Sequence, residues 1–84
     1  MTLGTFVTNC SECDGYICIQ GKEYFDGDYD YEILWDSKVN TNNNLPYIPR
    51  NLFNAQIEDF SFGLSGDGYP RLNIFLDVDV EDYL

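Results

Sequence analysis

Two segments of this sequence alternate between apolar and acidic side chains with a period of two, and this alternation constrains the fold more than any other feature. In residues 28–36 one set of alternate positions is apolar or aromatic, and the other is acidic except at Leu34. Residues 72–81 repeat the pattern. Because successive side chains of a strand point to opposite faces of a sheet, both segments are predicted to be strands with one core-facing side. The predicted core-facing side chains are Tyr29, Tyr31, Ile33 and Trp35, and then Leu72, Ile74, Leu76, Val78 and Val80.

Short runs separated by turn signals predict the rest of the sheet. Clusters of Gly, Asn, Asp and Pro separate runs rich in Val, Ile, Tyr and Phe, as in an all-β domain. Turns are expected at residues 20–22, at Asp26-Gly27 and at the hairpin loop 65–68. Further strands are expected at residues 5–8, 16–19, 23–25 and 60–64, and the last strand at 69–80.

The middle of the chain is different, because residues 37–45 are rich in Asn and predict a flexible loop. Pro49 follows, with Phe53 and Ile57 at helical spacing, so at most one short helix is expected near residues 49–57. The predicted fold is mainly β, a small antiparallel sheet or sandwich of about five strands, and α+β is the alternative. Residues 1–84 allow one small domain.

The charge of the chain is strongly negative. The sequence contains fifteen Asp and Glu residues and four Lys and Arg residues, which gives a formal net charge of -11. A small domain usually carries roughly 2–8 net charges, and a larger excess costs stability through self-repulsion. Hydrophobic residues make up 44% and aromatic residues 17%, too many for a disordered acidic tail. Direct binding to nucleic acid or an anionic membrane is disfavoured, so a basic partner is expected.

The acids fall in two blocks, residues 12–36 and 58–82, and the stretch 37–57 between them has none. Two rows of carboxylates on strands that lie side by side would approach the charge density of one nucleic-acid strand, though not of a duplex. Tyrosines beside the acids are candidate anchors for a partner. The predicted partner-binding residues are Asp26, Asp28, Asp30, Glu32, Asp36, Glu58, Asp59, Asp77, Asp79, Glu81 and Asp82.

Metal sites are incomplete in this sequence, and no cofactor is expected. Cys10 and Cys13 have the spacing of a zinc knuckle, but only Cys18 is available as a third ligand and there is no histidine. Residues 26–30 resemble the start of a calcium loop, yet Tyr31 stands where the loop needs Gly and Ser37 where it needs Glu. An odd number of cysteines favours reduced thiols and a cytoplasmic protein.

Catalysis and membrane insertion are also disfavoured. Without histidine, a Ser or Cys nucleophile lacks its usual base, so the chain is not expected to be an enzyme. No run of about 18 apolar residues predicts a membrane span, and the N-terminus does not have the pattern of a secretion signal.

In size, charge and strand-borne acidity the chain resembles, in physical type, the nucleic-acid mimics with which bacteriophages block host defence, such as anti-CRISPR and anti-restriction proteins. The resemblance implies a non-catalytic inhibitor, monomeric or a small homo-oligomer, that binds the nucleic-acid channel of a nuclease or a CRISPR or restriction complex in the host cytoplasm. No motif assigns roles to residues. The alternatives are an immunity protein that neutralises a basic nuclease toxin, a structural or oligomeric accessory protein, and an ordinary sheet whose acids only solvate its outer side.

Overall fold

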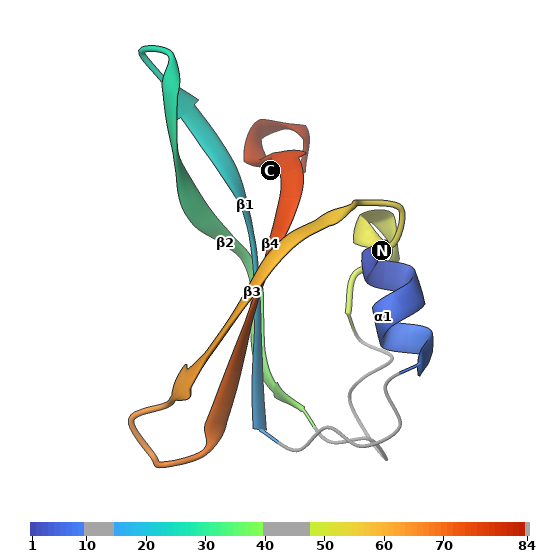
Figure 1. The fold of residues 1–84 in the computed structure, drawn as a ribbon, viewed down its shortest axis with the longest axis vertical. Helices are drawn as coiled ribbons and strands as arrows, with labels where there is room; N and C mark the ends of the chain where they lie inside the picture. The colour runs from blue at the N-terminus through green and yellow to red at the C-terminus, as the bar shows by residue number, and fades with distance from the viewer. Residues whose placement is uncertain (10–14, 40–47, 84) are drawn as a thin grey trace.

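The segments with alternating and β-branched residues form one four-stranded sheet in the computed structural model, which describes residues 1–9, 15–39 and 48–83 (Figure 1). The prediction of a mainly β fold with a short helix is confirmed, although the α-helix lies at Leu3–Asn9 and not near residues 49–57. The elements are α1 (Leu3–Asn9), β1 (Gly15–Phe25), β2 (Asp28–Val39), the 3₁₀ turn η2 (Arg50–Leu52), β3 (Ile57–Leu64), β4 (Pro70–Asp79) and the 3₁₀ turn η3 (Val80–Asp82).

The strand order is β2-β1-β4-β3. Two hairpins, β1–β2 and β3–β4, are antiparallel, and they meet through a parallel pairing of β1 with β4. The sheet is therefore mixed, whereas an antiparallel one was expected. The closed ends of the two hairpins extend in opposite directions (Figure 1), so each hairpin has a segment that projects beyond the shared centre of the sheet.

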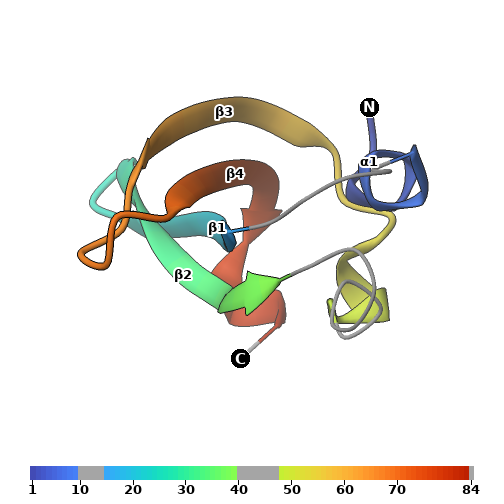
Figure 2. The same ribbon diagram turned by 90° about the horizontal axis from the view of Figure 1, so that it is seen from below.

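One side of the sheet, here called the core face, carries Ile17, Ile19, Ile74 and Leu76, all fully buried. Leu3 of α1 and Leu52 of η2 belong to the same cluster. Figure 2 shows α1 and η2 together at one side of the sheet. Backbone bonds tie them together, since Leu3 and Gly4 donate to the carbonyls of Ala55 and Phe53 at 2.9 Å each. The other side of the sheet is called the outer face.

The first predicted strand, residues 5–8, is wrong, because this segment lies inside α1. Four residues are too few to separate a strand from a helix by periodicity. Leu3, Phe6 and Val7 also have helical i, i+3, i+4 spacing, and all three pack into or against the core. The Thr2 hydroxyl accepts a hydrogen bond from the Thr5 amide at 3.1 Å, as at a helix N-terminus.

The predicted turn at residues 20–22 is also wrong, since β1 continues to Phe25. Gly21 is needed for packing and not for a turn: a Cβ there would lie 3.0 Å from side-chain atoms of Leu34, Val78 and Val80. The turn at Asp26-Gly27 is confirmed, with φ of 48° and 81°. Two consecutive residues with positive φ are typical of the tight type I′ hairpin turn.

A bulge at Leu34 changes the predicted faces of β2. Trp35 pairs with Ile19 and Ile33 pairs with Gln20, so Leu34 has no partner in β1. Leu34 and Trp35 both pack against the core. A bulge reverses the alternation that follows it. Tyr29, Tyr31 and Ile33, predicted to face the core, therefore lie on the outer face, which is a correction to the sequence prediction.

The strands and the hairpin loop predicted for the C-terminal half are found in the structure. Strand 60–64 lies within β3, the 65–68 loop closes the β3–β4 hairpin, and Ile74, Leu76 and Val80 are buried. The helix expected near 49–57 is only the three-residue turn η2, because Ile57 already pairs with Leu76. The final strand ends at Asp79. Residues 37–39 of the predicted loop belong to β2, and residues 40–45 of it lie outside the described part.

Candidate functional site: the faces of the β1–β2 arm

The part of the β1–β2 hairpin beyond the core, residues 21–33, is here called the arm, and it projects from the sheet (Figure 1). Every residue from Glu23 to Asp30 is exposed. Because the two strands are in continuous register from Gly21↔Glu32 to Phe25↔Asp28, each face of the arm is defined by cross-strand partners. The two faces have different chemistry.

The face of the arm that continues the core face carries carboxylates. Glu23 pairs with Asp30, Gly21 with Glu32 and Phe25 with Asp28. We call Glu23, Asp28, Asp30 and Glu32 the carboxylate face. Neighbours along β2 on this face are about 6.6–6.8 Å apart, and cross-strand pairs are about 4.5–5.5 Å apart. The β2 row alone has about half the linear charge density of one nucleic-acid strand, which has one charge per about 3.4 Å.

The pKa of Glu23 is raised by its acidic neighbours on the carboxylate face. A hydrogen bond with Glu32 and the charge of Glu32 raise its pKa, and Asp30 and Glu81 of η3 add to the effect. Glu23 was not among the residues predicted for the site. The signal was in the sequence: once Gly21 is placed inside a strand, strict alternation puts Glu23 on the same face as Gly21.

The opposite face of the arm is aromatic. Ring centroids of Tyr24 and Tyr29 are 5.7 Å apart, and those of Tyr29 and Tyr31 are 5.5 Å apart. Tyr31 also contacts Phe75 of β4, with centroids at 4.5 Å. Tyr24 and Ile33 are each 53% exposed, so part of this ladder is open to solvent. Aromatic side chains at such a surface are suited to anchoring a protein partner.

Under the aromatic ladder lies Lys22, a buried cation on β1 that is 6% exposed. Its Nζ is 2.9 Å from Oε1 of Glu58 and 3.1 Å from Oδ1 of Asp77, and 4.8 Å from the ring centre of Tyr29. The Tyr31 hydroxyl donates to Oε2 of Glu58 at 2.8 Å. The bonds from Lys22 and then Tyr31 lower the pKa of Glu58, and burial, followed by Glu58, raises the pKa of Tyr31.

Several predicted partner-binding acids therefore have structural roles. Glu58 and Asp77 neutralise Lys22, and Asp36 forms an ion pair with Arg71 at 2.9 Å on the outer face. Asp59 accepts from the amide of Phe60, and Asp79 accepts from the amide of Glu81. The other predicted acids form no ion pair among the described residues: Asp26 in the hairpin turn, Asp28, Asp30 and Glu32 on the carboxylate face, and Glu81 and Asp82 in η3. Of these, Asp28 accepts from the amide of Tyr29.

The two acidic blocks do not form adjacent rows. β1 lies between β2 and β4, and the Asp77 side chain is on the outer face whereas Asp30 and Glu32 are on the carboxylate face. The arrangement brings together Glu23, Asp30 and Glu32 with Glu81. It does not bring Asp36, Asp59 or Asp77 to that surface.

The metal candidates gain no support among the described residues, where no three His, Cys, Asp or Glu side chains form a group that could hold an ion. Cys10 and Cys13 lie outside that part of the chain. Cys18 is a buried free thiol, and burial raises its pKa. A thiol in such surroundings is a poor nucleophile and a poor ligand.

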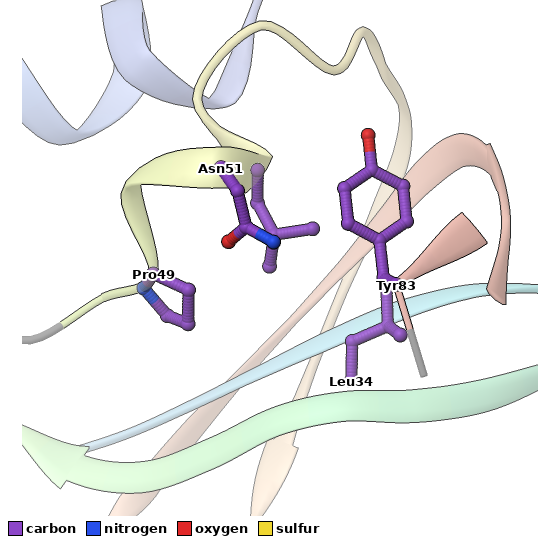
Figure 3. A pocket seen from close by; sticks show the side chains of 5 residues that line it. Leu34, Pro49, Asn51 and Tyr83 are labelled. Carbon is purple, nitrogen blue, oxygen red and sulfur yellow. The ribbon is translucent and has the colours of Figure 1, made fainter. Parts of the chain in front are cut away.

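A pocket of about 110 Å³ lies between η2, β2 and the segment after η3 (Figure 3). Leu34, Leu52, Pro49, Asn51 and Tyr83 line it. Its volume is below the ~300 Å³ at which small-molecule sites usually begin. Among the described residues, its polar lining groups are the amide of Asn51 and the phenol of Tyr83.

The fold and these faces define the class of protein: an acidic, mainly β domain with a projecting two-faced hairpin. Comparisons with family models, with curated proteins and with solved structures find no match to the chain. Within the described ranges, no helix is long and apolar enough to cross a membrane.

Proposed function

We propose that this chain is a non-catalytic inhibitor that binds a basic protein surface through the carboxylate face of the arm and blocks a nucleic-acid-binding enzyme. The observation that carries the proposal is the gathering of exposed carboxylates on one face of the arm, where Glu23 pairs with Asp30 and Glu32 lies next along β2. A hydrogen bond with Glu32 and the charge of Glu32 raise the pKa of Glu23. Like charges directly opposite each other destabilise a sheet. A basic partner relieves this repulsion on binding.

The distribution of the four basic residues supports the same proposal. Lys22 and Arg71 are in ion pairs on the outer face, and the Nζ atom of Lys38 lies 3.5 Å from the ring centre of Tyr69. Arg50 is exposed in η2. Among the described ion pairs, none involves an acid of the carboxylate face. A cluster of exposed acids of this kind steers a basic surface toward it and speeds association.

The aromatic face adds the second requirement of a tight complex. Charge at the rim of an interface mainly changes the rate of association, whereas buried aromatic anchors supply most of the affinity. Tyr24, Tyr29 and Ile33 are exposed on the same arm as the acids, on its other face. A partner that contacts both faces of the arm binds the carboxylates and the apolar side chains at the same time. A channel or cleft in the partner would allow this.

The test is capture from a nuclease-treated bacterial lysate on the immobilised protein, followed by elution with DNA and RNA oligonucleotides and identification by mass spectrometry. The proposal predicts that nucleic-acid-binding proteins are retained at low salt and that an oligonucleotide releases them. If the retained protein is a basic nuclease that no oligonucleotide displaces, the chain is an immunity-type protein instead. Retention that is indifferent to salt contradicts both.

A matched pair of double variants assigns the surface. Asp30→Asn with Glu32→Gln removes two charges from the carboxylate face, and Asp59→Asn with Asp82→Asn removes two charges elsewhere. The first pair is expected to abolish capture and the second to leave most of it. Equal loss in both pairs means that only net charge matters, which contradicts the arm as the binding surface.

A further inference from the structure

The two edge strands of the sheet differ in how they are protected. Edge strands expose unpaired amides and carbonyls, and charged side chains are a usual protection against pairing with another chain. β2 carries four acids, and Asp28 also accepts from the Tyr29 amide at 2.8 Å. β3 has no charge between Asp59 and Asp67.

The start of the β3 edge is covered by the chain itself. The Ile57 amide donates to the Met1 carbonyl at 2.8 Å, and Thr2 forms a bridge with Gln56. The Phe60 amide donates to the Asp59 side chain at 2.8 Å, so it points away from β4. The cover by Met1 and Thr2 therefore ends at Ile57.

The hydrogen-bond alternation identifies the open groups beyond Phe60. The Ser65 amide donates to the Tyr69 carbonyl at 2.9 Å, which makes Ser65 and Tyr69 a hydrogen-bonded pair. In an antiparallel ladder such pairs alternate with non-bonded ones, whose amides and carbonyls point outward. Counting back, Leu64 and Phe62 point their backbone groups to the open edge, as Phe60 does.

The side chains of the same residues are apolar and exposed. Phe62 is 81% exposed, Leu64 76% and Phe60 37%. They pair with Leu72, Pro70 and Ile74 of β4, so all three lie in one stripe on the core face of the sheet. An open, uncharged strand edge that carries an apolar stripe is a typical site for the addition of another strand.

We infer that β3 pairs with β3 of a second copy of this chain, antiparallel and centred on Phe62, and so joins two sheets into one. In this register Phe62 faces Phe62 of the second copy, and Phe60 faces its Leu64. Each facing pair exchanges two backbone hydrogen bonds. The Phe60 amide exchanges its bond to Asp59 for one to the second copy. The two apolar stripes meet on one face.

The register is compatible with the high charge. Asp59 faces Ser65 of the second copy, and Glu58 faces its Gly66, so no acid is opposite another acid. The same neutrality argues for a second copy over a basic partner, because a basic strand gains no charge pairing along residues 60–66. The remaining repulsion between two chains of charge -11 is long-range, and salt screens it.

Sedimentation equilibrium of the whole chain at several concentrations tests the pairing. The expected result is a species of twice the 9.7 kDa chain mass whose dissociation constant falls by about tenfold or more between about 20 and about 500 mM NaCl. A mass of 9.7 kDa at millimolar concentration and high salt overturns the inference.

Substitutions at the two edges assign the interface. Phe62→Lys is expected to weaken self-association by about tenfold or more although it lowers the net negative charge. The matched control is Ile33→Lys on the other edge strand, where the side chain is 53% exposed. It is expected to leave self-association unchanged or to strengthen it slightly. Equal weakening by both, or none by Phe62→Lys, contradicts pairing at β3.

Cross-linking tests the register, in a background with Cys10→Ser and Cys13→Ser. Facing residues of a hydrogen-bonded pair have Cα atoms about 5.5 Å apart, within disulfide range. Phe62→Cys is expected to form a disulfide-linked dimer under mild oxidation, and Leu64→Cys, which faces Phe60, much less. The reverse result contradicts the register.

The inference does not depend on the proposed function, and the two respond to salt in opposite directions. Binding of a basic partner weakens with salt, whereas pairing of two acidic chains strengthens. The arm and the β3–β4 loop point in opposite directions (Figure 1), so the arm stays accessible in the pair. Failure of one proposal is therefore distinguishable from failure of the other.

Discussion

Lys22 donates from Nζ to Oε1 of Glu58 at 2.9 Å, across β4, and this contact joins two strands that are not neighbours in the sheet. Glu58 lies at the irregular step in β3 between Ile57 and Asp59. Through its second oxygen it also accepts from Tyr31 of β2. The outer face thus has an ion pair that links three strands, and both carboxylate oxygens of Glu58 are engaged in it.

Removing the cation is expected to destabilise the sheet. Lys22→Met keeps most of the buried side-chain length but removes the charge-assisted bonds to Glu58 and Asp77, with an expected loss of about 2 kcal/mol in the free energy of unfolding. Urea unfolding at neutral pH measures the loss. Arg50→Met, at an exposed position, is the control and is expected to change little. Equal stability of wild type and Lys22→Met contradicts a structural role for the pair.

The contribution of Glu58 to the free energy of unfolding is expected to decrease at low pH. Hydrogen bonds from Lys22 and Tyr31 lower its pKa in the folded state, so its stabilisation is complete above the ordinary value of 4.5 and is lost as pH falls through the lower folded value. The difference in urea midpoint between wild type and Glu58→Gln is therefore expected to be largest at neutral pH and to shrink below about pH 4.5. A difference that does not change with pH contradicts this pairing.

Glu23 is expected to behave in the opposite way. Its pKa is raised by Glu32 and its other acidic neighbours, so its ionised form is unfavourable in the folded state and its contribution improves as pH falls through the raised value. Glu23→Gln is expected to raise Tm at pH 7 by about 2 °C. The advantage should vanish near pH 4.5 and decrease in high salt. A lower Tm in this variant contradicts a repulsive carboxylate face.

How far the sequence predicts the fold is clearest along β2. The period-two pattern of residues 28–36 correctly predicts a strand, and the acids at Asp28, Asp30 and Glu32 do share a face. The bulge at Leu34 has no local signal, because it is set by the requirement that both Leu34 and Trp35 reach the core. One extra residue moves Ile33, Tyr31 and Tyr29 to the outer face, and this error spreads to the predicted site.

The ion pairs could not be predicted for a related reason. Lys22 contacts residues 36 and 55 positions away, and Arg71 contacts a residue 35 positions away. These contacts depend on the strand order and on the parallel pairing of β1 with β4, neither of which is encoded in a local pattern. The sequence therefore identifies which residues are acidic and on strands, but not which of them are already neutralised.

A substitution at Gly21 tests whether this glycine is needed for close packing. Gly21→Ala puts a methyl group 3.0 Å from the side chains of Leu34, Val78 and Val80, and the expected destabilisation is about 1–3 kcal/mol. Gly63→Ala, in β3 with nothing within 4 Å of the added carbon, is the matched control and is expected to be neutral or slightly stabilising. Similar free energies of unfolding for the two variants contradict the close packing at Gly21.

The most direct measurement is the salt dependence of binding to a captured nucleic-acid-binding protein, compared between wild type and the Asp30→Asn, Glu32→Gln variant. We expect the wild-type dissociation constant to rise steeply with NaCl and to rise further when an oligonucleotide competes. We expect the variant to bind more weakly and with a shallower salt slope. Unchanged affinity and an unchanged slope in the variant would contradict the carboxylate face as the binding surface.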